Sequence, residues 1–403
     1  MNKFITECEN RLQDKYRLID ENAYFNQVKV LNAFKNQRIS LRHFNGTTGY
    51  GYDDEGRDGL GKLYAEAFGA ECGIVSPHIL SGTHALTVAL FGLLRPKDTL
   101  LCISGMPYDT LRPVIFGEGN GSLKDYGINF DCCDLTDGDF DYATVKSKID
   151  ASVKIVYIQR SRGYELRDAF SCAQIEKMCQ FLRAGGFNGC IFVDNCYGEF
   201  VETREPTEVG ADVIVGSLIK NAGGGLAQNG GYICGKEKYI NLIGNRLTTP
   251  STGLEVGAYP LGYQYLYQGL FLAPHTVAQA LKCSILIGYA MSQLGYKNYP
   301  SLDKTPYDIT RAIKFDSADK MIEFIREIQY ASPIDSFVTC EAWDMPGYDE
   351  KIIMAAGTFV SGSSVELSAD GPIKPPYIAY FQGGLTYEHG KYALERICAK
   401  WSK

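Results

Sequence analysis

The sequence lacks the features that mark several large classes of protein. No run approaches the ~18 apolar residues that a membrane helix needs. The N-terminus shows neither the apolar core nor the small-residue cleavage site of a signal peptide. No basic block of the kind that follows nucleic acid stands out, and the formal net charge is -7. We therefore expect a cytoplasmic protein that binds neither nucleic acid nor a membrane.

Metal and nucleotide motifs are missing as well. The 13 cysteines form no Cys-x-x-Cys pair, and the 5 histidines show no ligand spacing, so we expect no metal. An odd number of cysteines without an export signal is typical of reduced thiols. No Gly-x-Gly-x-x-Gly follows an early strand and no Walker-type Gly-Lys-Ser/Thr occurs, which argues against a nucleotide-dependent dehydrogenase.

The length and the order of segments predict two α/β domains. The chain has 403 residues, and a single core stops growing at roughly 250–300 residues. We expect an N-terminal helical arm over residues 1–45 and a large domain over 46–270. A linking helix over 271–294 then leads to a smaller C-terminal α/β domain over 295–403.

Apolar runs of strand length alternate with helical patterns through the large domain. Helical spacing is clear over 83–94 and 172–184. Strand, helix and strand at this spacing favour a mostly parallel sheet covered on both faces. The predicted strands are 73–75, 99–103, 153–158, 190–193, 213–215 and 231–234.

Two polar elements follow predicted strands. Ser81-Gly82-Thr83 opens a helix, where backbone N–H groups and hydroxyls suit a phosphate, although such a serine is more often a plain N-cap. Asp194 ends a buried strand and stands at the carboxyl edge of the sheet, where open α/β sheets bind ligands. Taken alone, Asp194 is better explained as a helix cap or a turn residue.

A lysine and a tyrosine have comparable positions. Lys220 comes after an apolar strand and before three glycines, and burial would lower its pKa and free the amine for a Schiff base. Its alternative is a surface lysine whose stem lies along the protein. Tyr108 follows the strand 99–103 and can stack on a flat ring, or simply be a half-buried loop residue.

Together these elements match the needs of pyridoxal 5'-phosphate (PLP), since a lysine carries its aldehyde and a carboxylate keeps its ring nitrogen protonated. The chain resembles fold-type-I PLP enzymes, in particular the methionine gamma-lyase-like family also known as aluminium-resistance carbon–sulfur lyases and cystathionine beta-lyase-like proteins. The resemblance implies an aspartate aminotransferase-like fold. The stretches that carry it include Gly46-Thr-Thr-Gly-Tyr-Gly, Ser81-Gly-Thr-His-Ala, Ile158-Gln-Arg-Ser-Arg-Gly-Tyr, Val193-Asp-Asn-Cys-Tyr-Gly, Gly216-Ser-Leu-Ile-Lys-Asn and Val365-Glu-Leu-Ser-Ala-Asp-Gly-Pro.

The resemblance assigns roles position by position. Lys220 would bind the aldehyde and move protons between substrate carbons, and Asp194 would pair with the ring nitrogen. Tyr197 would lie near the 3-hydroxyl, and Tyr108 would stack on the ring and protonate a leaving sulfur. The phosphate would be held by Ser81, Gly82, Thr83 and Ser217, and by Tyr50, Tyr52 and Arg57 of a neighbouring subunit in at least a homodimer.

Three departures from the family pattern bear on the substrate. Ala222 stands where relatives have proline after Lys220, Gln228-Asn229 stands where they tend to have Pro-Thr, and Lys374 replaces an expected arginine. For the substrate carboxylate, a planar bidentate clamp favours arginine. Arg160 and Arg162 follow a strand at the active edge, with Lys374 as a further candidate, although solvent-facing charge explains them equally well.

The implied reaction is elimination on methionine, homocysteine or a cystathionine-like amino acid, which yields a thiol, ammonia and a 2-oxo acid. Two alternatives stay open. One is a different PLP reaction on the same scaffold, namely γ-replacement, β-elimination or transamination, because a fold does not determine its chemistry. The other is a scaffold protein that has lost catalysis. The joint presence of Lys220, Asp194 and Ser81 argues against it, because an inactive site would have no reason to keep all three.

Overall fold

Apolar strands alternate with amphipathic helices to build the larger of the two main sheets. The computed structural model describes residues 3–345 and 350–401. The strands of the large domain are β1 (Cys72–Ser76), β2 (Thr99–Cys102), β3 (Asn129–Cys132), β6 (Val153–Gln159), β7 (Cys190–Asp194), β8 (Val213–Ser217) and β9 (Gly231–Gly235). They form one sheet in the order β1-β9-β8-β7-β6-β2-β3, parallel except for β9.

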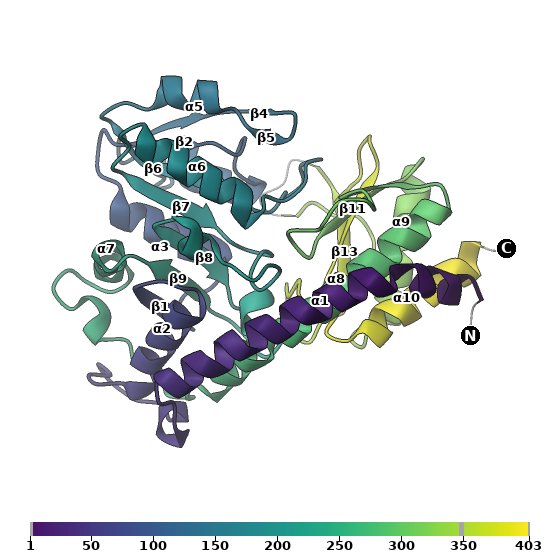
Figure 1. Ribbon diagram of the computed structural model, residues 1–403, viewed down its shortest axis with the longest axis horizontal. Helices are drawn as coiled ribbons and strands as arrows, with labels where there is room; N and C mark the ends of the chain where they lie inside the picture. The colour runs from purple at the N-terminus through teal and green to yellow at the C-terminus, as the bar shows by residue number, and fades with distance from the viewer. Residues whose placement is uncertain (1–2, 346–349, 402–403) are drawn as a thin grey trace.

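Helices cover both faces of this sheet (Figure 1). They are α2 (Glu55–Ala67), α3 (Gly82–Leu93), α4 (Arg112–Phe116), α5 (Tyr142–Lys148), α6 (Cys172–Ala184) and α7 (Glu237–Leu247). α6 shows why such segments are helical. Its buried Ile175, Met178 and Leu182 recur at helical spacing, and the Ser171 hydroxyl at its N-cap accepts a hydrogen bond from the Gln174 N–H. A small hairpin of β4 (Leu135–Thr136) and β5 (Asp139–Phe140) lies beside α5.

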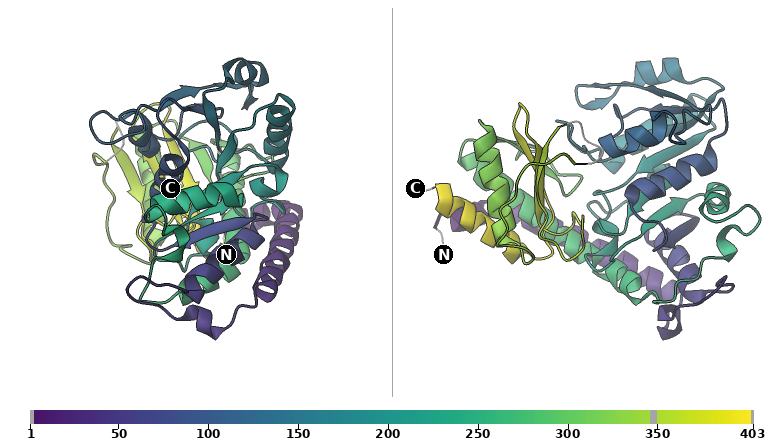
Figure 2. Two further views of the ribbon diagram at one scale, coloured as in Figure 1. Left: turned by 90° about the vertical axis from the view of Figure 1, so that its left-hand side faces the viewer. Right: turned by 180° about the vertical axis from the view of Figure 1, so that it is seen from behind.

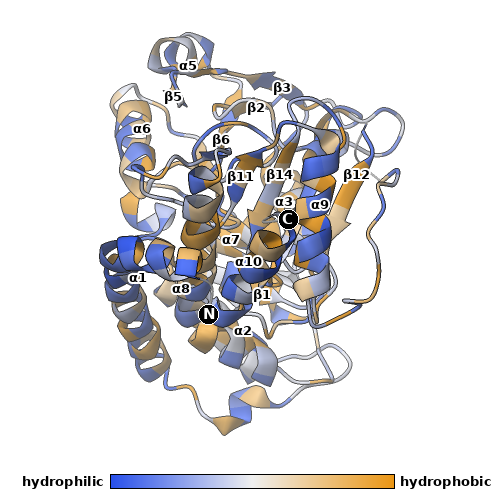
Figure 3. Ribbon diagram, turned by 90° about the vertical axis from the view of Figure 1, so that its right-hand side faces the viewer, coloured by the Kyte–Doolittle hydropathy of each residue, from blue (hydrophilic) through white to orange (hydrophobic). Residues whose placement is uncertain are grey.

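The second sheet belongs to the C-terminal domain and is antiparallel. Its strands β10 (Lys297–Tyr299), β11 (Arg311–Lys314), β12 (Ile352–Ala355), β13 (Ser368–Pro372) and β14 (Ile378–Gln382) are ordered β10-β11-β14-β13-β12. Helices α9 (Ala318–Ala331) and α10 (Tyr387–Trp401) pack on one face. Figure 3 shows hydrophobic residues along β12 and β14 and hydrophilic residues on α9, as expected for a helix with one buried face.

Two long helices connect the domains. α1 (Lys3–Asn36) and α8 (Gln264–Gln293) lie side by side along the base of the molecule (Figure 2). By length and composition α8 could cross a membrane, but 72% of its apolar window is buried inside the protein, so its role as a core helix accounts for its composition. α8 begins at Gln264 rather than at residue 271, because the helix continues back into the end of the predicted large domain.

The structure also contains strands that the sequence patterns did not predict. β3 lies at the edge of the large sheet and is only partly buried, so it lacks a continuous apolar run. β13 reads Ser-Ala-Asp-Gly-Pro, a poor strand sequence by propensity, yet it is paired on both sides, with β12 and with β14. Tertiary pairing outweighs local preference there.

Candidate active site

A cavity of about 280 Å³ lies between the carboxyl ends of the large sheet and the small sheet. The ends of β6, β7 and β8 and the start of α3 provide one wall, and β13 and β14 provide part of the other. Most residues predicted to bind the cofactor line this cavity: Ser81, Gly82, Thr83, Tyr108, Asp194, Tyr197, Ser217 and Lys220.

Lys220 follows β8 in a loop that is pressed against α8. Gly224 in this loop has φ of +57°, and a Cβ there would lie 2.2 Å from the Gly269 carbonyl oxygen of α8, so the approach requires glycine. The Lys220 Nζ lies 4.0 Å from the centroid of the Tyr197 ring. The Tyr197 hydroxyl in turn accepts a hydrogen bond from Ser364 of the small domain, at 3.1 Å.

The charge state of Lys220 differs from the sequence-based expectation. Burial lowers the pKa of the Lys220 amine, but the acidic groups of Cys196, Tyr197 and Asp194 face it, and the balance raises this pKa well above its ordinary value. The shift therefore favours the protonated form of the amine. A cation at this position attracts an anionic ligand into the cavity.

Asp194 ends β7 at the floor of the same cavity. Its Oδ1 accepts a hydrogen bond from the Cys196 N–H at 3.1 Å, and its Oδ2 accepts one from the Tyr157 hydroxyl at 3.4 Å. Burial raises the pKa of this carboxyl, and the neighbouring Lys220 opposes the shift. The hydrogen bonds fix the position of this carboxylate, and Lys220 compensates its charge only in part. Such a carboxylate is suited to pair with a protonated ring nitrogen.

The start of α3 and the end of β8 form a polar cradle. The Ser217 Oγ is buried and has no hydrogen-bond partner within the described residues. A Cβ at Gly82 would lie 3.3 Å from the Ser217 Cβ, so glycine keeps this space open. Ser81 caps the helix by accepting the His84 N–H at 3.1 Å. An unsatisfied hydroxyl beside a helix N-terminus fits a phosphate group.

Tyr108 borders the cradle from the loop after β2. Its hydroxyl is 2.6 Å from the Thr83 Oγ1, and its backbone N–H donates to the Gln159 Oε1 at 2.9 Å. Burial raises the pKa of the Tyr108 phenol, so it remains protonated at physiological pH. It can therefore donate a proton to a leaving group in the cavity.

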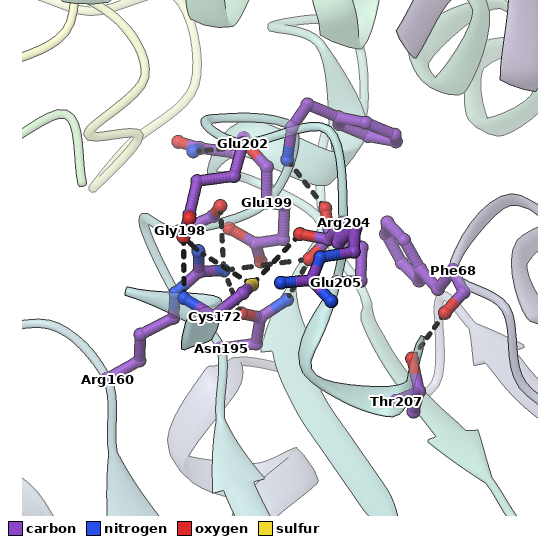
Figure 4. A network of polar contacts seen from close by, with 12 residues as sticks. Phe68, Arg160, Cys172, Asn195, Gly198, Glu199, Glu202, Arg204, Glu205 and Thr207 are labelled. Carbon is purple, nitrogen blue, oxygen red and sulfur yellow. Dashed lines mark hydrogen bonds and ion pairs between the residues drawn. The ribbon is translucent and has the colours of Figure 1, made fainter. Parts of the chain in front are cut away.

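Arg160 requires a correction, since we predicted that it binds the substrate carboxylate. It is fully buried and does not line the cavity. Its guanidinium lies 2.7 Å from the Glu202 carboxylate and 3.6 Å from that of Glu205, and it donates to the Asn195 Oδ1 at 2.7 Å (Figure 4). These partners satisfy the guanidinium, so Arg160 stabilises the turn after β7 and is not available to a substrate.

The other predicted carboxylate ligands also lie outside the cavity lining. Arg162 is buried, with a nitrogen donating to the Tyr299 carbonyl at 2.9 Å and another 3.8 Å from Asp308. Lys374 is exposed on the small domain, and its amine lies 3.8 Å from the Glu350 carboxylate. The sequence could not show this, because both positions depend on how the two domains pack.

The loop residues predicted to act from a neighbouring subunit are away from this chain's own cavity. Tyr50 and Tyr52 are 72% and 61% exposed and stack on each other with ring centroids 5.5 Å apart. Arg57 lines a separate, larger hollow of about 1130 Å³ at α2 and the start of β1. A single chain therefore does not bring these residues to its Lys220.

Sequence reasoning missed several residues that line the cavity. Gln159 ends β6 at the same edge as Asp194, so its position at a strand end was a usable signal. The others come from loops and from the small domain, where no local pattern marks them: Asp109, Thr110, Ser161, Gly163, Tyr164, Cys196, Ile219, Thr310, Asp370, Tyr380 and Gln382.

Comparisons with known proteins agree with this geometry. A family model described as methionine gamma-lyase matches residues 1–402. Protein YnbB of Bacillus subtilis is 48% identical over 98% of this chain and 94% of its own length. A proposed cystathionine beta-lyase involved in aluminum resistance from Listeria monocytogenes has a TM-score of 0.97 and 47% identity, and the match covers 99% of this chain and 100% of that one. A carbon-sulfur lyase involved in aluminum resistance from Clostridium novyi has a TM-score of 0.95 and 45% identity, covering 99% and 95%.

More distant structures confirm the predicted fold. The PLP-dependent protein YhfS from Escherichia coli has a TM-score of 0.63 at 18% identity, covering 95% of this chain and 97% of its own. A proposed O-acetylhomoserine (thiol)-lyase from Campylobacter jejuni, with a pyridoxyl-lysine, has a TM-score of 0.58 at 17% identity. The architecture is thus that of fold-type-I PLP-dependent enzymes.

Proposed function

Because the chain belongs to the methionine gamma-lyase family, we propose that it is a PLP-dependent carbon–sulfur lyase that eliminates a thiol from a sulfur-containing amino acid. The observation that carries the proposal is the placement of Lys220, Asp194 and Ser217 around one cavity. A lysine amine that faces the cavity, a buried carboxylate and an unsatisfied hydroxyl beside a helix N-terminus match the aldehyde, ring nitrogen and phosphate of one cofactor.

The cofactor of the family is pyridoxal 5'-phosphate, and the residues present here fit it. When bound, it supplies an electron-withdrawing ring that makes the Cα–H bond of an attached amino acid acidic. Ser81, Thr83 and Ser217 would hold its phosphate. Asp194 would keep a proton on its ring nitrogen, and Lys220 would carry its aldehyde.

The side chains of this protein then account for the proton movements of an elimination. The Lys220 Nζ, in its uncharged form, takes the proton from the substrate Cα and redistributes it between neighbouring carbons. The Tyr108 hydroxyl, kept protonated by burial, gives a proton to the departing sulfur. In sum, a thioether amino acid and one water yield a thiol, ammonia and a 2-oxo acid, with no external oxidant or reductant.

A second candidate is β-elimination, favoured by the names of the solved relatives. The Listeria monocytogenes relative is described as a proposed cystathionine beta-lyase. The two reactions cleave cystathionine on opposite sides of its sulfur. β-Elimination releases pyruvate and homocysteine, whereas γ-elimination releases 2-oxobutanoate and cysteine.

The purified protein, incubated with methionine, homocysteine or cystathionine, tests the proposal. We expect a 2-oxo acid, ammonia and a thiol in equal amounts, and the identity of the 2-oxo acid separates the two eliminations. Lys220→Ala should lose at least about 1,000-fold in turnover, since it removes the proton-transferring amine. Amino-group transfer without thiol release, or unchanged turnover in the Lys220→Ala variant, would contradict the proposal.

A further inference from the structure

A carboxylate from the small domain lines the cavity and has no role in the chemistry described above. Asp370 lies in the middle of β13 and is 7% exposed. Its Oδ2 accepts a hydrogen bond from the Tyr164 hydroxyl, and its Oδ1 accepts one from the Gln382 amide at 3.3 Å. All three residues line the cavity. Asp370 is thus held by two neutral donors at the wall that the small sheet provides.

No cationic side chain compensates this carboxylate within residues 3–345 and 350–401. Ion pairs in that part of the chain include no partner of Asp370 within 4.0 Å. Burial accordingly raises the pKa of Asp370 to about 6, so it is still mostly ionised at pH 7.5. An ionised carboxylate offers about four acceptor positions, and the two donors leave capacity toward the cavity.

The charged residues in the cavity lining leave a negative charge at the wall formed by the small sheet. Lys220 is the single Lys or Arg among the described lining residues, and it faces Asp194 on the large-domain wall. Asp109, also in the lining, is already paired with Arg112 at 2.8 Å. Asp370 is therefore the carboxylate in the lining that awaits a cation, and burying a charge is favourable only once it is paired.

We propose that Asp370, held by Tyr164 and Gln382, binds an ammonium group on the part of the substrate beyond the reacting carbon–sulfur bond. This inference rests on the proposed function and narrows its substrate class. It selects thioether amino acids with a second amine, such as cystathionine, over methionine and homocysteine, whose side chains end in uncharged groups.

Binding to the holoenzyme, read from the change in cofactor absorbance, tests this without requiring turnover. The probes are cystathionine, methionine, S-(2-carboxyethyl)-homocysteine and S-(3-carboxypropyl)-cysteine, the last two of which each lack one amine of cystathionine. In the wild type we expect cystathionine to bind about 10–100-fold more tightly than the analogue that lacks the distal amine, as for other hydrogen bonds to charged groups.

The variant Asp370→Asn keeps an oxygen for the Tyr164 hydroxyl but removes the charge. It should weaken cystathionine binding about 10–100-fold and leave methionine binding within about 3-fold. Asp109→Asn is the matched control, because it removes the same charge from the cavity lining at a carboxylate that is already paired with Arg112, so it should retain the preference for cystathionine. Unchanged absorbance of the bound cofactor shows that each variant is folded.

Two results would overturn the subsite: a wild type that binds cystathionine and its deamino analogues equally, or an Asp370→Asn variant that weakens all ligands alike. Thiol release is measured in parallel. If thiol is released without any dependence on the distal amine, the subsite is wrong and the lyase proposal stands. If cystathionine binds through Asp370 and no thiol appears, the lyase proposal is wrong and the cation subsite stands.

Discussion

Glu199 is a carboxylic acid enclosed beside the loop that carries Lys220, where the Asn221 amide donates a hydrogen bond to the Glu199 carbonyl. It is fully buried, and its Oε1 accepts a hydrogen bond from the Tyr232 hydroxyl at 2.8 Å. Its Oε2 has no partner within the described residues. Burial raises the pKa of this carboxyl from an ordinary 4.5 to about 8. Glu199 is therefore neutral at pH 7 in the folded protein and ionised in the unfolded chain.

This difference predicts how stability depends on pH. Between the two pKa values the folded state holds a proton that the unfolded state has released, so a rise in pH lowers the free energy of unfolding. From about pH 6 to pH 9 the wild type should lose about 2–3 kcal/mol more than Glu199→Gln, which cannot titrate. Urea unfolding of the cofactor-free proteins at both pH values measures this. Parallel losses in the two proteins would show that Glu199 does not titrate in this range.

Tyr108 predicts a dependence on the leaving group. Its phenol is buried, protonated and 2.6 Å from the Thr83 Oγ1, so Tyr108→Phe removes a proton donor and preserves the ring. We expect kcat to fall about 100-fold for an alkyl thioether, whose thiolate needs a proton. For an aryl thioether, whose thiolate leaves unaided, the loss should be small. An equal loss for both substrates would show that the Tyr108 hydroxyl does not act on the leaving sulfur, and no loss for either would assign Tyr108 to ring stacking alone.

At the scale of elements, the N-terminus of a helix can contribute to the stability of the fold and to the binding of a ligand. Ser81 caps α3 beside the cavity, while Ser171 caps α6 away from it. Each hydroxyl accepts a backbone N–H three residues on, and the loss of such a cap costs about 1 kcal/mol. The two caps therefore form a matched pair.

Ser81→Ala and Ser171→Ala should lose similar unfolding free energy without cofactor, about 1 kcal/mol each. PLP affinity should fall about 10-fold in Ser81→Ala alone, because Ser81 also lines the cavity at the polar cradle, where we propose that the phosphate binds. Denaturant titrations of the cofactor-free proteins and absorbance titrations with PLP measure the two effects. A Ser171→Ala variant with equally weakened PLP affinity would mean that general destabilisation explains both.

The strands also show which parts of the fold a local sequence pattern can predict. β6, β7 and β8 are buried along nearly their whole length, so their continuous apolar runs predicted them closely. β11 and β13 contain the buried residues Arg311 and Asp370, and distant segments cover them: Arg311 bonds to Ser284 of α8, and Asp370 lines the cavity between the two sheets. Such strands have no apolar run, so their pairing partners define them.

At the scale of the whole molecule, we propose that the working unit is at least a homodimer. Arg57 donates to the Gly51 carbonyl at 2.8 Å and pairs with Asp58 at 2.8 Å, which holds the Tyr50–Tyr52 loop at the surface. The two exposed tyrosines project from the chain instead of packing on its own core. A loop so arranged is suited to reach into a neighbouring subunit's cavity.

Mixed subunits test this arrangement. Lys220→Ala and Arg57→Ala proteins should each be inactive, but mixing and reassembly should restore about a quarter of wild-type activity, because half of the dimers then contain one intact site. Size-exclusion chromatography with light scattering checks the assembly. Mixtures that remain inactive while hybrids form would mean that Arg57 acts within its own chain.

The sequence by itself determined the fold class, the cofactor and most of the predicted cofactor ligands that line the cavity. Strand ends, helix caps and a lysine before glycines are local features, because a few consecutive residues define each of them. Asp194, Ser217 and Lys220, which have such features, line one cavity. Only the tertiary structure decided what surrounds the substrate. Arg160 lies in an ion-pair network with Glu202 and Glu205. Asp370 and Gln382 line the cavity from the small sheet, whose strands pair across long loops. Which charge faces a ligand depends on the packing of distant segments, and no local pattern encodes that packing.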